Sequence, residues 1–308
     1  MRLAAIDIGT NSTKMTIADV SEDGKLTVVS EQSDVTRLGE GVDASKRLNE
    51  AAMSRTLEAI ARFAEDARQQ GAEEVLGAGT SALRDAENGA DFLAEAMNRA
   101  GVEIEIITGD REAELAFAAV RADASLNLPI DASLLVFDIG GGSTEIILGD
   151  SRGVGRHKSL DIGAVRLTER FLHSDPPTEY ELTQASQFAR AAFEMFPAPN
   201  VSPTVAGIGG TAVNIAAVTQ GLAKPALDAL HGVTLSQADV SAALDRFKHL
   251  PLAERRQIPG LEPKRADIIV AGALILDCLL TYFKADRFIL SVRGLRYGLL
   301  AEHAKAVR

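Results

Sequence analysis

The sequence predicts an α/β fold built from two related halves, and three observations support this prediction. Apolar segments with strand patterning alternate with segments of helical periodicity along most of the chain. The segment 4–17, AAIDIGTNSTKMTI, returns at 135–148 as LVFDIGGGSTEIIL, which indicates an internal duplication. Hydrophobic residues make up 46% and charged residues 24% of the chain, the balance of a globular protein.

The first half is expected to open with a three-stranded antiparallel meander. Its strands are predicted at 3–8, 14–20 and 26–29, with Asp23-Gly24 as a hairpin turn before the third strand. Helices at 49–70, 90–100 and 111–122 then alternate with strands at 75–80 and 104–108. This alternation predicts that the sheet continues with mostly parallel strands.

The second half is expected to follow a polar connection at 123–133, the candidate domain boundary. Strands are predicted within 134–148 and at 203–206 and 287–292, and helices at 164–172, 179–196, 212–219, 238–249, 264–283 and 295–306. We therefore expect one domain at 1–125, completed by the closing helix at 295–308, and a second domain at 126–294.

Composition and charge narrow the class of protein. The net charge of -11 argues against a nucleic-acid or anionic-membrane partner, because such proteins need a broad basic surface. Residues 1 and 2 lead directly into a strand pattern, so we predict no export signal. The apolar run 268–283 is short for a membrane span and is interpreted as a buried helix, with a homodimer interface as the alternative. A single cysteine, Cys278, fits a cytoplasmic protein.

The two repeated turns are candidate phosphate-binding sites. Gly140, Gly141 and Gly142 permit close approach of the backbone to an anion, and Ser143 and Thr144 add hydroxyl groups. The matching positions in the first copy are Thr10, Asn11 and Ser12. Either turn alone is also explained as a turn that simply needs small residues. Their repetition favours a shared anionic ligand.

Carboxylates accompany both turns. Asp7 and Asp138 end the two strands that lead into the turns, and Glu145 follows the second turn. Carboxylates beside phosphate oxygens are typical ligands of Mg²⁺, held directly or through water. The alternative is that each aspartate bonds the amides of its own turn.

Five segments in order resemble the Ppx/GppA family of exopolyphosphatases and guanosine pentaphosphate phosphohydrolases. They are DIGTNS at 7–12, GTSALRD at 79–85, ITGDREA at 107–113, DIGGGSTE at 138–145 and GIGGT at 207–211. The resemblance covers nearly the whole chain. It implies two actin-like (ribonuclease H-like) domains with hydrolysis in the cleft between them.

The resemblance implies that Glu112 activates the attacking water. The family motif has an acid before this residue, where this sequence has Arg111, so the neighbouring charge differs. Taken without the family, Glu112 lies in the first turn of a helix, where an acid offsets the helix dipole. A carboxylate at a helix start is also placed to accept a proton from water.

Three arginines are candidate phosphate ligands, because the guanidinium group offers two parallel N–H donors. They are Arg37 in a glycine-punctuated loop, Arg84 between a strand and a helix, and Arg265 before the long apolar helix. An ion pair of Arg84 with Asp85 or Asp91 is the alternative for that residue. The resemblance also implies that Gly209, Gly210 and Thr211 lie near phosphate or nucleotide.

The favoured function is a Mg²⁺-dependent exopolyphosphatase that releases orthophosphate from inorganic polyphosphate. Hydrolysis of the 5′-terminal phosphate of guanosine pentaphosphate (pppGpp) uses the same groups and stays open. A sensor that binds an alarmone or a nucleotide such as ADP without hydrolysis is a third interpretation, supported by Arg111. The sequence has no P-loop motif, and its five histidines lack the spacing of a zinc site.

Overall fold

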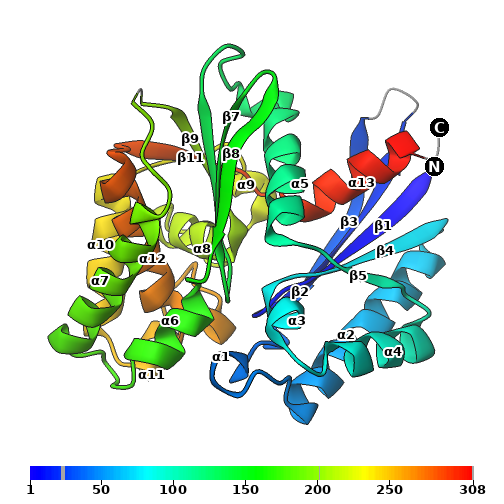
Figure 1. Cartoon of the computed structure of the whole chain (residues 1–308), viewed down its shortest axis with the longest axis horizontal. Helices are drawn as coiled ribbons and strands as arrows, with labels where there is room; N and C mark the ends of the chain where they lie inside the picture. The colour runs from blue at the N-terminus through cyan, green and yellow to red at the C-terminus, as the bar shows by residue number, and fades with distance from the viewer. Residues whose placement is uncertain (22–24, 201, 307–308) are drawn as a thin grey trace. The chain divides into compact units, whose positions relative to one another are not determined.

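The computed structural model describes residues 1–21, 25–200 and 202–306, and the chain divides into two compact units. Unit 1 comprises Met1–Ala119 together with the C-terminal segment from Arg293, and unit 2 comprises Val120–Val292. Each unit contains one mixed β-sheet with helices packed against it (Figure 1). The predicted α/β class is confirmed.

The sheet of unit 1 has five strands in the order β3-β2-β1-β4-β5. The strands are β1 Arg2–Ile8, β2 Thr13–Val20, β3 Leu26–Asp34, β4 Glu74–Gly79 and β5 Ile104–Ile106. The first three pair antiparallel, and β1–β4 and β4–β5 pair parallel. The predicted meander and its parallel continuation are therefore confirmed, while the Asp23-Gly24 turn lies outside the described residues.

The helices of unit 1 cover both faces of this sheet. They are α1 Val42–Ser45, α2 Glu50–Gln69, α3 Ser81–Asp85, α4 Gly89–Ala100, α5 Gly109–Arg121, whose last two residues belong to unit 2, and α13 Leu295–Ala306. Side chains alternate across β1, so Ile6 and Ile8 pack in the same cluster as residues of α2 and α4. Leu3 and Ala5 pack with α13 on the other face (Figure 1). By the same alternation Asp7 belongs to the α13 face.

The sheet of unit 2 has six strands in the order β10-β11-β9-β6-β7-β8. The strands are β6 Leu134–Ile139, β7 Thr144–Asp150, β8 Gly153–Leu160, β9 Thr204–Ile208, β10 Thr234–Ser236 and β11 Arg287–Leu290. The series β8-β7-β6-β9-β11 repeats the order of unit 1, with β10 added antiparallel to β11. This repeat is the structural counterpart of the duplicated sequence.

The helical segments of unit 2 surround a large apolar core. They are α6 Ala164–Phe171, α7 Glu179–Glu194, α8 Gly209–Thr219, α9 Leu227–Leu230, α10 Gln237–His249, α11 Leu252–Arg255 and α12 Ile269–Phe283, with 3₁₀ turns at Ala124–Leu126 and Pro263–Arg265. Helix α12 lies in the core with Cys278 buried, which confirms the buried-helix interpretation. No helix in the described part of the chain is long and apolar enough to span a membrane.

Two local predictions were wrong, and strands β8 and β10 were not predicted. Helix α8 begins at Gly209 rather than at 212, because a backbone φ of 94° at this glycine turns the chain directly from β9 into the helix. Residues 264–268 do not begin α12, since Pro263–Arg265 form a separate 3₁₀ turn. Strand β8 was not predicted because it lies at the sheet edge, where most of its residues are only partly buried, and its sequence lacks alternating apolar residues.

Candidate active site

The two repeated turns close with the same hydrogen bond. In unit 1 the amide of Gly9 donates to the carbonyl of Ser12 at 3.1 Å, and in unit 2 Gly140 donates to Ser143 at 3.0 Å. Each turn joins the central strand of its sheet to an antiparallel neighbour. The repeated sequence has therefore produced a repeated turn at the same place in each sheet.

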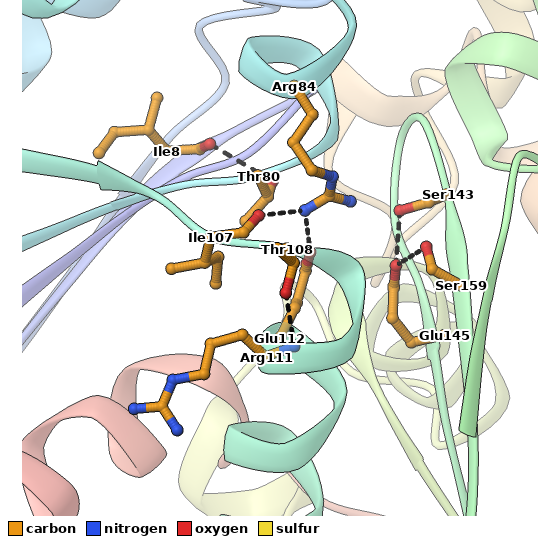
Figure 2. A network of polar contacts seen from close by, with 10 residues as sticks. All are labelled: Ile8, Thr80, Arg84, Ile107, Thr108, Arg111, Glu112, Ser143, Glu145 and Ser159. Carbon is orange, nitrogen blue, oxygen red and sulfur yellow. Dashed lines mark hydrogen bonds and ion pairs between the residues drawn. The ribbon is translucent and has the colours of Figure 1, made fainter. Parts of the chain in front are cut away.

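A threonine supports each turn from the next strand along the sheet. The hydroxyl of Thr80, which follows β4, donates to the carbonyl of Ile8 at 3.4 Å (Figure 2). The hydroxyl of Thr211, in the first turn of α8, donates to the carbonyl of Ile139, also at 3.4 Å. Both bonds fix the residue after the motif aspartate, and the strands that precede the threonines, β4 and β9, run parallel to the central strand.

In unit 1 the turn carbonyls are held by the loop that follows β3. The carbonyl of Thr10 accepts from the amide of Gly39 at 2.8 Å, and that of Asn11 accepts from Arg37 at 3.0 Å. A trans peptide places its C=O and N–H on opposite sides, so the amides of Asn11 and Ser12 point away from this loop. The side-chain amide nitrogen of Asn11 is buried without a hydrogen-bond partner in the described part of the chain. This unpaired donor fits an anionic ligand.

The supporting loop is itself constrained. Arg37 has a left-handed φ of 54°, a conformation that costs energy for a residue with a side chain and is often found at functional sites. A Cβ added at Gly39 would lie 2.2 Å from the Thr10 methyl group. Glycine is thus required for the close contact between the loop and the turn.

In unit 2 the turn carbonyls are held by the start of α6. The carbonyl of Gly140 accepts from Ala164 at 2.9 Å, and that of Gly141 accepts from Val165 at 2.8 Å. The amides of Gly141 and Gly142 must then point away from α6. Neither donates a hydrogen bond to any described residue. Successive unbonded amides of this kind form an anion-binding concavity.

The two hydroxyl groups after the glycines are already engaged within unit 2. Ser143 Oγ donates to Glu145 Oε1 at 2.7 Å, and Thr144 Oγ1 donates to the carbonyl of Ile162 at 2.6 Å. Thr144 is completely buried. The Thr144 side chain holds the turn in place. Because the Ser143 hydroxyl already donates to Glu145, the backbone amide of Ser143 is the group better placed to bind an anion.

Two carboxylates of unit 2 lie on neighbouring strands. Asp138 on β6 is directly opposite Glu145 on β7 in the strand register, so both side chains leave the same face of the sheet. Glu145 is only 1% exposed, and its Oε1 accepts from Ser143 and from Ser159 Oγ at 2.8 Å (Figure 2). A Cβ at Gly209 would lie 2.3 Å from Asp138 Oδ1, so glycine is needed beside this carboxylate.

The corresponding pair in unit 1 has a different charge. Asp7 on β1 is opposite Lys14 on β2. Loss of water around the Asp7 carboxylate raises its pKa, and the positive charges of Lys14 and Arg296 oppose that rise. Unit 1 therefore pairs its motif aspartate with a cation, where unit 2 pairs it with a second carboxylate.

The first turn of α8 packs closely against an arginine of unit 2. A Cβ at Gly210 would lie 2.6 Å from Arg265 Cζ, so the guanidinium group lies directly over this glycine. Arg265 Nε donates to Glu262 Oε2 at 2.9 Å, which fixes the orientation of the group. One cluster therefore contains Asp138, Gly209, Gly210 and Arg265. Their positions in the sequence alone do not reveal this cluster.

In unit 1 the predicted base and the favoured arginine are in direct contact. Arg84 Nη1 donates to Glu112 Oε2 at 2.8 Å and to the carbonyl of Ile107 at 3.0 Å (Figure 2). Both side chains are largely buried. The ion pair considered for Arg84 is formed with Glu112 and not with Asp85 or Asp91 among its described salt bridges.

Known proteins are similar to this chain over most of its length. The model of the Ppx/GppA phosphatase family matches residues 6–306. The chain belongs to this family. Exopolyphosphatase 2 of Mycobacterium tuberculosis is 38% identical over 290 residues, covering 90% of this chain and 89% of that protein. The predicted family is confirmed, and with it the predicted class of enzyme, a phosphatase.

Solved structures of the family agree with the fold. The Aquifex aeolicus member of the Ppx/GppA family superposes with a TM-score of 0.83 at 33% identity, covering 100% of this chain and 99% of that one. An exopolyphosphatase from Cytophaga hutchinsonii superposes with a TM-score of 0.88 at 26% identity, with the same coverage. The two-sheet fold expected from the sequence is thus that of the family.

Arg111 departs from the Ppx/GppA motif, and its side chain is directed away from Glu112 (Figure 2). The guanidinium group pairs with Glu302 of α13 and lies 3.8 Å from Glu114. Its backbone amide donates to Thr108 Oγ1 at 3.1 Å at the start of α5. The arginine therefore joins two helices of unit 1 and leaves the contact between Arg84 and Glu112 intact.

Sequence reasoning missed three residues that this geometry brings to the Ppx/GppA motifs. Lys14 and Ser159 were missed although the strand register places them opposite Asp7 and Glu145. Arg166, whose Nε donates to the carbonyl of Gly142 at 2.7 Å, was missed because an arginine on a short helix normally faces solvent. The sequence repeat did contain a signal for Lys14. It aligns residues 7 and 14 with residues 138 and 145, so Lys14 occupies the position of Glu145.

Proposed function

We propose that this phosphatase is a Mg²⁺-dependent exopolyphosphatase that removes the terminal phosphate of inorganic polyphosphate. Water attacks the terminal phosphorus, the P–O–P bond breaks, and the bridging oxygen leaves with the shortened chain. The proton of the water passes to Glu112. Glu112 and Arg84 belong to unit 1, and the carboxylates Asp138 and Glu145 belong to unit 2.

The contact between Arg84 and Glu112 is the observation that carries the proposal. A guanidinium at 2.8 Å favours the ionised form of the carboxylate, the form that accepts a proton. Arg84 uses Nη1 for Glu112 and Ile107, while its Nε and Nη2 donate to no described residue. One arginine is therefore able to hold the base and a phosphate oxygen at once. That arrangement orients the water relative to the phosphorus.

The carboxylates of unit 2 fit a magnesium ion. Asp138 and Glu145 are hard oxygen donors on one face of the sheet, and two like charges in this position favour a cation between them. The described residues contain no group of three or more His, Cys, Asp or Glu side chains arranged for a metal. One or two carboxylates completed by substrate phosphates are typical for Mg²⁺. A bound Mg²⁺ supplies positive charge that offsets the charge of the phosphates.

The backbone of the two turns provides the remaining contacts with phosphate. Amides at Asn11, Ser12, Gly141 and Gly142 point away from the segments that hold their carbonyls, as derived above. Arg37 and Arg265 add cationic groups beside the turns. In a protein with a net charge of -11, such local donors are needed to bind a polyanion.

The test is a phosphate-release assay with the wild type and Glu112→Gln on long polyphosphate, short polyphosphate and pppGpp. We expect kcat on polyphosphate to fall about 100-fold or more, because general-base catalysis contributes at least this factor. Glu114→Gln is the matched control, since Glu114 lies on the same helix and pairs with Arg111. It should retain near wild-type activity.

Three results would contradict parts of this proposal. Retained activity in Glu112→Gln would remove Glu112 from its role. Faster hydrolysis of pppGpp than of polyphosphate by the wild type would make the nucleotide the substrate. Binding of either polyanion without phosphate release would instead support the sensor.

A further inference from the structure

We infer that Arg166 is a positioning residue that prevents the peptide between Gly142 and Ser143, the third peptide of the glycine turn, from flipping. It thereby keeps the amide of Ser143 directed toward phosphate. Arg166 lies in the first turn of α6 and is 6% exposed. Its Nε donates to the carbonyl of Gly142 at 2.7 Å. No sequence motif pointed to this residue.

The backbone bonds around Arg166 fix the other two peptides of the turn. The carbonyls of Gly140 and Gly141 accept from the amides of residues 164 and 165, and the amide of Arg166 also donates to Gly141 at 3.1 Å. No backbone amide donates to the carbonyl of Gly142 in the described chain. The guanidinium group therefore does for the third peptide what the start of α6 does for the first two.

The direction of each amide follows from the direction of the carbonyl in the same peptide. Because the peptide is trans and planar, a carbonyl of Gly142 held toward Arg166 sends the amide of Ser143 the opposite way. Three consecutive amides, at 141, 142 and 143, then share one direction and form an anion-binding concavity. A flipped Gly142–Ser143 peptide would present a carbonyl oxygen, which repels phosphate.

Glycine makes this flip easy, and this explains why an arginine is placed here. Gly142 has no Cβ, so it has more backbone conformations available than any other residue. A buried charged donor forms a stronger hydrogen bond than a neutral one, and this bond selects one conformation. In unit 1 the corresponding residues are Thr10 and Asn11, whose side chains already limit the backbone, and two backbone amides hold their carbonyls.

The inference rests on the proposed function, and its test measures binding separately from turnover. The variant is Arg166→Met, which removes the donor and the charge while keeping apolar length. Affinity for inorganic tripolyphosphate is measured by calorimetry, and KM and kcat are measured on long polyphosphate. We expect Kd and KM to rise about tenfold, since one charge-assisted hydrogen bond sets the geometry of one phosphate contact, with a smaller change in kcat.

Arg170→Met is the matched control, because Arg170 lies one turn further along α6, is exposed, and stacks on Phe188. It removes the same charge from the same helix and should leave Kd and KM unchanged. Arg166→Lys keeps the charge with a single donor group and should restore part of the affinity. An equal loss in both Met variants would show a general charge effect and overturn the inference.

The remaining outcomes also decide the question. Wild-type Kd and KM in Arg166→Met would overturn it. If Arg166→Met lacks a cooperative thermal transition, Arg166→Lys carries the test, and a Kd equal to that of the wild type would then overturn the inference. A wild type that binds tripolyphosphate without hydrolysing polyphosphate would contradict the proposed function, and the binding comparison between variants would still test Arg166.

Discussion

The two halves of the molecule share one turn geometry but differ in what surrounds it. In unit 1 the motif aspartate faces Lys14, and a loop containing Arg37 holds the turn. In unit 2 the motif aspartate faces Glu145, and the start of α6 holds the turn. A duplicated scaffold has therefore kept its backbone while the facing residue changed sign.

This change of charge indicates that the two units differ in their capacity to bind a metal ion. Lys14 and Arg296 place positive charge near Asp7, so this aspartate is a weaker candidate for a metal ligand than Asp138. Two carboxylates at the same positions repel unless a proton, a hydrogen-bond donor or a cation is present. Ser143 and Ser159 donate hydrogen bonds to one oxygen of Glu145, and a metal ion would reduce the repulsion between the two carboxylates. We therefore propose that a metal ion would bind chiefly in unit 2.

The largest predicted effect compares the two aspartates directly. Asp138→Asn should lower phosphate release about 100-fold, the upper end of the losses seen when groups that orient metal ligands are removed. Asp7→Asn should have a smaller effect, about tenfold, because Lys14 and Arg296 already place positive charge near this carboxylate. Phosphate release is measured over a range of Mg²⁺ concentrations, and only Asp138→Asn should require more Mg²⁺.

Asp150→Asn is the control for this comparison, since Asp150 lies at the far end of β7 and pairs with Arg152. Equal losses in Asp138→Asn and Asp7→Asn, with equal shifts in the Mg²⁺ requirement, would break the assignment of the metal to unit 2. A larger loss in Asp7→Asn would reverse it.

The next prediction compares the contacts that hold the two turns. A Cβ at Gly163 would lie 2.4 Å from the carbonyl oxygen of Gly141, a backbone atom that cannot rotate away. A Cβ at Gly39 would meet the methyl group of Thr10, which can move by rotating its side chain. Gly163→Ala should therefore destabilise the protein by about 1–3 kcal/mol, and Gly39→Ala by less.

Urea unfolding measures both variants, with Gly155→Ala as the control because its added Cβ would make an ordinary contact at 3.4 Å. Gly163→Ala should also raise KM for polyphosphate, since it displaces the glycine turn. A greater loss of stability in Gly39→Ala would indicate that the unit 1 turn is the more rigid of the two.

Much of this fold could be predicted because its signals are local. The strands that lead to Asp7 and Asp138 are continuous apolar runs that end in glycine turns, and the repeat of this pattern identified both. The start of α8 at Gly209 could not be predicted in this way. Two glycines normally argue against a helix, and here close approach to Asp138 and Arg265 requires them.

The contacts within the candidate site also could not be predicted from local sequence patterns. Glu112 and Arg84 were each predicted, but their contact joins residues 28 positions apart and depends on how α5 meets the loop after β4. Arg166 was not predicted at all, because its role exists only once α6 packs against the glycine turn. The chemistry of each candidate side chain could be predicted from the sequence, whereas its hydrogen-bond and ion-pair partners depended on tertiary packing.

The smallest predicted effect is a difference in the pH dependence of stability between Asp7 and an exposed aspartate. Burial raises the pKa of Asp7 above its ordinary value of 3.8, so over the window above that value the folded state holds a proton that the unfolded state has lost. Stability contributed by this group must then fall as pH rises. Asp7→Asn removes the fall, so its stability relative to wild type should increase between pH 4.5 and pH 8 in urea unfolding.

Asp19 gives the opposite sign and serves as the control. The hydrogen bond from Arg2 lowers the pKa of Asp19, so its contribution to stability is present at neutral pH and is lost as pH falls through the lowered pKa. Asp19→Asn should therefore lose stability relative to wild type only as pH rises toward 3.8, and its relative stability should stay constant between pH 4.5 and pH 8. If Asp7→Asn follows the same trend as Asp19→Asn, Lys14 and Arg296 outweigh the burial of Asp7. The motif aspartate of unit 1 would then be a fully ionised partner of Lys14, and the contrast with the carboxylate pair of unit 2 would be sharper still.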